Sequence, residues 1–172
     1  MTLNLPPDVV WQAIEKELFA VLGMVTARQE ARTVGVVYVV RERRLYVGTG
    51  RDTWKARHVA QNPCVSVTIP IARRIPLMPW MKIPAATITF SGTARVLAAA
   101  EAPPGLLAQV FRGMAEDPAR MAGSVVIEVT PHKEFVTYGV GVPLMRMRDP
   151  EQARGRAAVS TAVQDVAPRG RF

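Results

Sequence analysis

Three short runs rich in Val, Thr and Tyr follow one another with almost no chain between them, over residues 19–28, 32–41 and 43–50. β-Branched and aromatic residues are typical of strands. The links between the runs, "RQEA" and the residues around Glu42, are too short for a crossover helix, so neighbouring strands must run antiparallel. The sequence therefore predicts that the fold begins with an antiparallel meander.

The rest of the chain continues this pattern of short strands and short helices. Further strands are predicted over residues 64–69, 85–99 and 123–131, and residues 132–139 are expected to be an extended segment or a last strand element. The run 85–99 is long enough to bend around a barrel, and Gly92 is the expected position of the bend. Short helices are predicted over residues 6–18, 53–61 and 105–117. This order favours a mainly β fold, a small closed or nearly closed barrel of six strands with short flanking α-helices.

The length of 172 residues corresponds to one domain with a core of its own. We expect residues 1–145 to form the barrel domain and residues 146–172 to form a C-terminal tail that docks on the body or on a partner chain. No apolar run approaches the roughly 20 residues that span a bilayer, and the N-terminus lacks the pattern of an export signal. We therefore expect a cytoplasmic protein that makes no contact with a membrane.

The chain carries a net charge of +8, so an anionic partner has to be considered. The arginines are spread along the chain and aromatic residues make up only 6%, which favours a general compositional origin of the charge over nucleic-acid binding. The single cysteine, Cys64, excludes an internal disulfide. One cysteine and two widely separated histidines are a poor metal-binding set. We predict neither a nucleic-acid partner nor a bound metal.

Polar and basic residues gather between two valine-rich strands in the stretch "VGTGRDTWKARHVAQNPCVSVTI", residues 47–69. The first strand ends at Gly50, Asp52 or Thr53 is a natural helix N-cap, and Asn62 and Pro63 end the helix. The first amides of such a helix have no intrahelical partner and lie at the positive end of the macrodipole. The corner between strand and helix is therefore suited to an anion such as a phosphate.

Side chains near this corner can strengthen an anion site. The hydroxyls of Thr49 and Thr53 can donate hydrogen bonds, and Lys55 or Arg57 can supply a full positive charge. The alternative is a surface helix on which the basic side chains are only solvated and Thr53 is only a cap. The residues by themselves leave both interpretations open.

The order of strand, polar corner, helix and strand resembles the signature of the pyridoxamine 5'-phosphate oxidase-like, flavin-binding split barrels. In that family a strand ending in Thr leads to a Ser/Thr-x-Lys helix start, a short helix, Asn/Asp-Pro and a strand of the form x-Val-Ser. The matching residues here are Thr49, Thr53, Lys55, Asn62, Pro63, Val65 and Ser66. The likeness covers residues 18–69 closely and residues 85–139 more loosely.

This resemblance implies a six-stranded antiparallel split β-barrel in residues 1–145 that binds flavin. It also implies a homodimer, with FMN held in two grooves between the subunits. The backbone of Val36 and Val37 would then touch the isoalloxazine ring, and Gly48 and Thr49 would lie near the ribityl chain. A flavin-binding role for these positions is therefore an expectation taken from the family.

The resemblance also implies which residues meet the cofactor phosphate. These are Thr53, Trp54 and Lys55, at the start of the helix. The second strand of the family often adds a basic residue at the phosphate, and Arg28 and Arg32 are the nearest candidates here. The C-terminal Arg and His motif that binds substrate in true pyridoxamine 5'-phosphate oxidases is not recognisable, so that particular reaction is not predicted.

The function implied is that of an FMN-dependent oxidoreductase acting on an unknown small molecule. The cofactor performs the chemistry in this class, so no catalytic triad is expected and no catalytic residue is named. One alternative is a deazaflavin-dependent reductase, whose cofactor carries an anionic oligoglutamate tail; another is a non-catalytic flavin or heme carrier. His58 and His132 are not assigned as heme ligands. The Pro-rich loop over residues 70–84 is the candidate for substrate selection.

Overall fold

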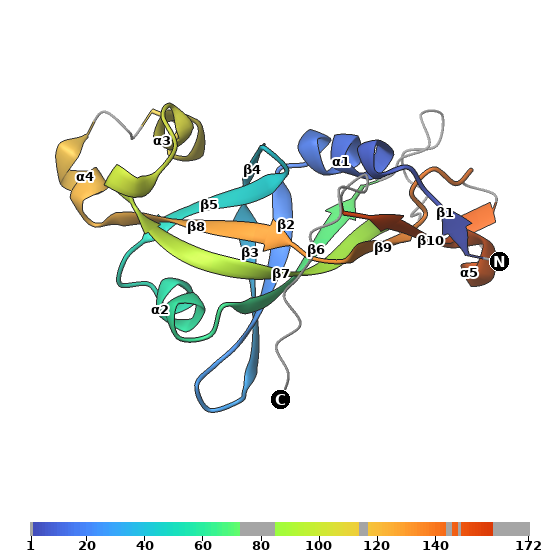
Figure 1. The fold of residues 1–172 in the computed structure, drawn as a ribbon, viewed down its shortest axis with the longest axis horizontal. Helices are drawn as coiled ribbons and strands as arrows, with labels where there is room; N and C mark the ends of the chain where they lie inside the picture. Colours follow the sequence, from blue (N-terminus) through green and yellow to red (C-terminus); the bar gives the residue numbers. More distant parts are fainter. Residues whose placement is uncertain (1, 73–84, 114–116, 144–145, 148, 160–172) are drawn as a thin grey trace, which may run out of the picture.

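The computed structural model describes residues 2–72, 85–113, 117–143, 146–147 and 149–159, and this part of the chain is mainly β (Figure 1). The strands are β1 (Leu3–Asn4), β2 (Phe19–Val25), β3 (Ala31–Val37), β4 (Val39–Arg41), β5 (Arg44–Gly50), β6 (Cys64–Ile71), β7 (Ala86–Ala98), β8 (Ser124–Pro131), β9 (Glu134–Tyr138) and β10 (Arg154–Ala158). The helices are α1 (Pro7–Lys16), α2 (Trp54–Gln61), α3 (Leu106–Val110), α4 (Pro118–Ala122), α5 (Pro150–Ala153) and the 3-10 helix η1 (Ala99–Glu101).

The strands form one curled sheet with the order β1-β10-β9-β7-β6-β2-β3, and β8, β5 and β4 branch from β7. β2 pairs antiparallel with β3, and β4 pairs antiparallel with β5, which confirms the predicted meander. Only Tyr38 separates β3 from β4. Because β4 pairs with β5 on the other branch, the sheet curls back on itself as a split barrel.

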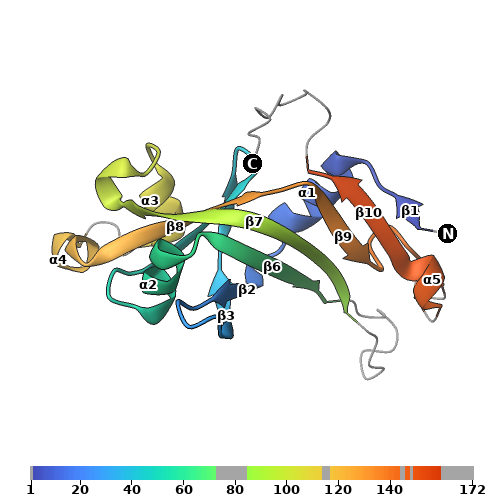
Figure 2. The same cartoon turned by 60° about the horizontal axis from the view of Figure 1, so that its bottom comes forward.

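The longest strand, β7, joins the two ends of the molecule. Residues 92–98 pair with β8 and residues 87–89 pair with β9. Figures 1 and 2 show it as one curved strand that runs from the end with α3 and α4 to the end with β10 and α5. A Cβ atom at Gly92 would lie 2.7 Å from the backbone oxygen of Thr130, so only glycine lets β8 approach here.

Alternating side chains fill the barrel, because successive residues of a strand point to opposite faces. On β6, for example, Val65, Val67 and Ile69 are buried while Cys64 and Ser66 are exposed. Phe90 and Phe135 lie in the same core in an edge-to-face arrangement, with ring centroids 5.3 Å apart. The packed interior is the main source of stability.

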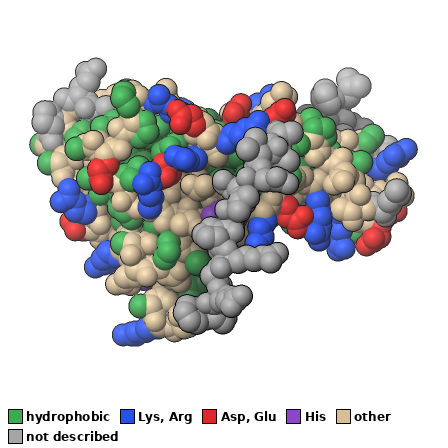
Figure 3. Space-filling model, in the orientation of Figure 1, with side chains coloured by type: hydrophobic (Ala, Val, Ile, Leu, Met, Phe, Trp, Pro, Cys, Tyr) green, Lys and Arg blue, Asp and Glu red, His purple; other side chains and the backbone are tan. Residues whose placement is uncertain are grey.

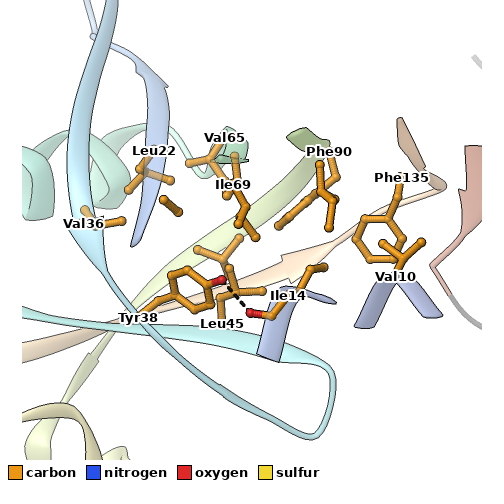
Figure 4. Packing of buried hydrophobic residues seen from close by; sticks show 14 of the residues in the cluster. Val10, Ile14, Leu22, Val36, Tyr38, Leu45, Val65, Ile69, Phe90 and Phe135 are labelled. Carbon is orange, nitrogen blue, oxygen red and sulfur yellow. Dashed lines mark hydrogen bonds between the residues drawn. The ribbon is translucent and has the colours of Figure 1, made fainter. Parts of the chain in front are cut away.

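Helix α1 closes one side of the barrel core. Its buried residues are Val10, Trp11 and Ile14. The hydroxyl of Tyr38 donates a hydrogen bond to the backbone oxygen of Ile14 at 2.7 Å (Figure 4). Burial raises the pKa of Tyr38 far above its ordinary value, so this hydroxyl stays a donor. The bond fixes the helix to the bend between β3 and β4.

Two details differ from the sequence-based expectation. Ten strands are described where six were expected. Tyr38 divides the run 32–41 into two strands, the expected extended segment 132–139 contains a full strand, β9, and β1 and β10 add a further parallel pair. The helix expected over residues 105–117 is also shorter. α3 ends at Val110, and Gly113 has a left-handed φ of 76°, which a continuing helix cannot accommodate.

The C-terminal segment contains α5 and adds β10 to the sheet, where β10 pairs with β9 and β1. The expected boundary between residues 145 and 146 stays a prediction, and residues 160–172 of the expected tail lie outside the described residues. The same holds for residues 73–84 of the Pro-rich loop. Within the described part of the chain, no helix has the length and apolar character needed to cross a membrane.

Candidate cofactor site

The corner between β5 and α2 is held by two threonine hydroxyls. Thr53 is the N-cap of α2: its Oγ1 accepts a hydrogen bond from the amide of Ala56 at 3.4 Å and donates one to the backbone oxygen of Gly50 at 2.8 Å. The Oγ1 atom of Thr49 lies 3.1 Å from that of Thr53. Since Thr53 has one hydroxyl proton and gives it to Gly50, Thr49 is the donor in this pair. Of the two predicted N-caps, Asp52 and Thr53, the structure therefore has Thr53.

The first amides of α2 point out of this corner. The first backbone hydrogen bond of the helix runs from the amide of Arg57 to the oxygen of Thr53 at 3.1 Å. The amides of Trp54 and Lys55 lie in the first turn, so neither has a hydrogen-bond acceptor within the helix. The first turn carries no acidic residue, and the side chain of Lys55 is half-buried beside it. These groups together form a donor set suited to an anion.

A basic residue from β3 lies beside this helix. Arg32, Trp54 and His58 line a common hollow of about 300 Å³. The rings of Trp54 and His58 are 5.6 Å apart at an angle of 61°. The Nδ1 atom of His58 is buried and has no hydrogen-bond partner among the described residues. Of the two predicted candidates, the structure brings Arg32 and not Arg28 to this hollow.

Val36 and Val37 lie on β3, apart from the corner. The side chain of Val36 is buried in the core, whereas Val37 points outward and is 63% exposed. Among the described strands β3 pairs only with β2, so one edge of its backbone has no neighbouring strand. A ring lying along that edge would meet unpaired backbone groups, as the family resemblance implies.

Gly48 and Thr49 are less exposed than Val37. A Cβ atom at Gly48 would lie 2.5 Å from Cγ1 of Val110 and 2.9 Å from the ring of Phe111, so α3 and the residue after it cover this glycine. Thr49 is buried and acts through its bond to Thr53. Val37 also lines a small hollow beside Val110, so the segment around α3 lies near both parts of the predicted site. The sequence-based prediction missed this segment, because no local pattern tells where so short a helix docks.

A buried carboxylate lies on the outer side of β8, away from α2. Glu128 accepts hydrogen bonds from Nε of Arg95 at 2.6 Å and from the hydroxyl of Tyr46 at 3.0 Å, and Nη1 of Arg44 is 3.6 Å away. Burial would raise the pKa of the Glu128 carboxyl, but the hydrogen bonds from Arg95 and Tyr46 and the charges of both arginines lower it below its ordinary value. The carboxylate is therefore ionised and fully paired.

Comparisons with known proteins identify the family and the fold of the chain. A family model described as "Pyridoxamine 5'-phosphate oxidase" matches residues 7–138. No curated protein matches the chain. Among solved structures, General Stress Protein 26 from Bacillus anthracis str. Sterne is 18% identical with a TM-score of 0.56, over 80% of this chain and 95% of that one.

Two further structures share the fold, with similar sequence identities and TM-scores. A putative pyridoxamine 5'-phosphate oxidase from Listeria innocua is 18% identical with a TM-score of 0.56, over 74% of this chain and 94% of that one. The heme storage protein HutZ from Vibrio cholerae is 16% identical with a TM-score of 0.58, over 81% of this chain and 97% of that one. At these identities the structures establish the common barrel and leave the ligand open.

Proposed function

Because the chain belongs to the pyridoxamine 5'-phosphate oxidase family, we propose that it binds FMN at the corner between β5 and α2 and acts as a flavin-dependent oxidoreductase on a small molecule. The observation that carries the proposal is the donor set at this corner: the leading amides of α2, the ammonium of Lys55 and the guanidinium of Arg32. These are the groups that hold a phosphate in proteins.

The flavin ring would lie along β3. Residues 32–37 span about 16 Å at the usual rise of a strand, which is a suitable distance between a phosphate group and a ring. The phosphate would bind between Arg32 and the start of α2, and the ring would lie against the unpaired edge at Val36 and Val37. The bound flavin supplies the electron and hydride chemistry, while the residues of this chain bind and orient it.

The outer surface of four neighbouring strands supports the proposed homodimer. Over residues 31–37, 19–25, 64–70 and 87–93, the outward-facing residues form a surface, the uncharged face, on which none carries a charge: Ala31, Thr33, Gly35 and Val37 of β3, Phe19, Val21, Gly23 and Val25 of β2, Cys64, Ser66, Thr68 and Pro70 of β6, and Thr87, Thr89, Ser91 and Thr93 of β7. Figure 3 shows, by contrast, charges of both signs along the upper part of the molecule.

The apolar end of the uncharged face is the proposed contact with a second copy. Val37 is 63% exposed, and its partner in register, Phe19, is 47% exposed. A Cβ atom at Gly35 would lie 2.7 Å from the ring of Phe19, so this ring covers Gly35 of β3. An uncharged apolar surface at a sheet edge favours pairing with an identical surface about a two-fold axis.

The proposal is tested by the absorption spectrum of the purified protein, before and after addition of FMN. We expect the bands of oxidised flavin in the protein fraction and a stoichiometry of one FMN per chain. A Soret band would instead favour a heme carrier, and a protein that takes up deazaflavin but no FMN would favour the deazaflavin-dependent alternative. A protein that binds none of the three would contradict the assignment. The cytoplasmic location stays a prediction.

A further inference from the structure

The hydroxyl of Thr53 is fully used inside the protein. It donates its one proton to the backbone oxygen of Gly50 at 2.8 Å. Its oxygen accepts hydrogen bonds from the amide of Ala56 at 3.4 Å and from the hydroxyl of Thr49 at 3.1 Å. A threonine hydroxyl offers one donor and two acceptor positions, so all three are taken. Thr53 therefore has no proton left for a phosphate oxygen.

The hydroxyl of Thr49 is used in the same way. Because it donates to Thr53, a chain of hydrogen bonds, the threonine chain, runs from Thr49 through Thr53 to the backbone oxygen of Gly50. Both hydroxyls, which the sequence offers as donors to an anion, thus donate within the protein. Neither can donate to a phosphate unless a bond of the threonine chain breaks.

The threonine chain holds the groups that do face an anion. The backbone oxygen of Gly50 accepts from the amide of Thr53 at 3.2 Å as well as from its hydroxyl, so the N-cap is tied to the end of β5. Trp54 and Lys55, whose amides have no acceptor within the helix, follow the N-cap directly. Backbone donors bind an anion well only when their direction is fixed, so their strength depends on this tie.

The other end of the threonine chain lies in the packed part of the sheet. Thr49 is 8% exposed and lies opposite Val125 in the pairing of β5 with β8. The preceding residue, Gly48, is covered by Val110 and Phe111. The side chain of Thr49 therefore has a fixed position, and its bond to Thr53 passes that position on to the start of α2.

We propose that Thr49 is a positioning residue for the phosphate: it acts through Thr53 to orient the amides of Trp54 and Lys55, and it makes no contact with the flavin. The inference deepens the proposed function and rests on it. The family resemblance implies a different role, in which Thr49 lies near the ribityl chain. A ribityl contact would act on every flavin, whereas positioning of these amides acts only on a flavin that carries a phosphate.

The test measures the dissociation constants of FMN and riboflavin by fluorescence titration. Thr49→Val keeps the shape of the side chain and removes the donor. We expect the FMN dissociation constant to rise about fivefold, the effect of one neutral hydrogen bond, while that of riboflavin stays unchanged. Thr49→Ser keeps the hydroxyl and should stay within about twofold of the parent for FMN.

Thr137→Val is the matched control. Thr137 is also a buried strand residue, but its Oγ1 has no hydrogen-bond partner among the described residues. The substitution therefore removes a hydroxyl that holds nothing, and it should change neither dissociation constant. An equal loss of FMN affinity in Thr137→Val and Thr49→Val would show a general effect of packing and would overturn the inference.

A double variant tests the path through Thr53. Thr53→Val removes the cap and should raise the FMN dissociation constant about fivefold or more. Adding Thr49→Val should then have no further effect, because the hydroxyl on which Thr49 acts is gone. Additive losses would show that Thr49 acts by another route, which contradicts the inference.

The two flavins separate failure of this inference from failure of the proposed function. Equal weakening of FMN and riboflavin by Thr49→Val would indicate a ribityl contact, and unchanged FMN affinity would show that the threonine chain does not orient the amides. Either result overturns the positioning role and leaves FMN binding in place. A parent protein that binds neither flavin overturns both.

Discussion

The sheet has two outward surfaces that follow the same alternation of residues but differ in what covers them. One is the uncharged face of β3, β2, β6 and β7. The other, the covered face, is formed by β5, β8 and the end of β7. Its apolar residues Tyr46, Leu97 and Val126 pack under Leu106 and Phe111, so the chain itself supplies their cover. The uncharged face has no such cover among the described residues.

This difference separates stability from function. The covered face buries large side chains and a carboxylate, and it compensates that carboxylate with two arginines and a tyrosine hydroxyl. The uncharged face leaves Phe19 and Val37 in solvent. An apolar surface left open in this way marks a site of binding. We therefore expect substitutions on the covered face to change folding and substitutions on the uncharged face to change association.

The sharpest test of the comparison removes one phenylalanine from each face. Phe111→Ala should lower the free energy of unfolding by about 3–5 kcal/mol, because the ring is 8% exposed and packs against Gly48. Phe19→Ala should cost about 1 kcal/mol or less, because that ring is 47% exposed. Urea unfolding followed by circular dichroism measures both. Equal losses in the two variants would remove the distinction between the faces.

The second prediction concerns the dimer. Val37→Lys places a charge in the centre of the proposed contact, and we expect the dissociation constant of the dimer to rise about a hundredfold or more, equivalent to about 2.7 kcal/mol. The fold should be unaffected, because this side chain is exposed. Val9→Lys, at an exposed position of α1, is the control and should leave the dimer intact. A parent protein that is monomeric in light scattering at micromolar concentration would refute the contact.

The third prediction concerns the buried carboxylate of the covered face. Glu128→Gln should lower the free energy of unfolding by about 2 kcal/mol at neutral pH, because Arg95 and Tyr46 lose a charged partner. Its control is Glu134→Gln at an exposed ion pair with Arg156, which should cost less than about 1 kcal/mol. If both variants lose the same stability, Glu128 has no special role.

The contribution of Glu128 also depends on pH. The folded-state pKa of Glu128 lies below its ordinary value of 4.5, so the stabilisation is fully present above that value and is lost as the pH falls through the folded-state pKa. We expect the parent to lose more stability than Glu128→Gln on acidification from pH about 7 to about 3. Parallel pH dependences in the two proteins would contradict the pairing seen in the structure.

Local signals in the sequence account for the part of the site that was predicted. A strand end at Gly50, a cap at Asp52 or Thr53 and the stop at Asn62 and Pro63 are each encoded within a few residues. The structure has the strand end and the stop where expected and uses Thr53 as the cap. The meander follows in the same way from links too short for crossovers. These features depend on neighbours in the chain, which a pattern can show.

The remaining features depend on contacts between distant segments. Arg32 reaches Trp54 only because the β2–β3 hairpin lies beside α2, and Gly48 is covered only because α3 docks on β5. Glu128 is an isolated acidic residue in a valine-rich run, and its burial follows from its register with Tyr46 and Arg95. Register across a sheet is set by the whole fold, so no local pattern could predict these contacts.

The central claim, that the start of α2 holds the phosphate of a flavin, is tested most directly by Lys55→Ala. Alanine preserves helix propensity, so the fold should remain. We expect FMN affinity to fall about tenfold, or about 1.4 kcal/mol, while riboflavin, which lacks the phosphate, binds both proteins equally. Lys16→Ala should change neither affinity. Titration of the three proteins with both ligands decides the matter: equal FMN affinity in the parent and Lys55→Ala would contradict the claim.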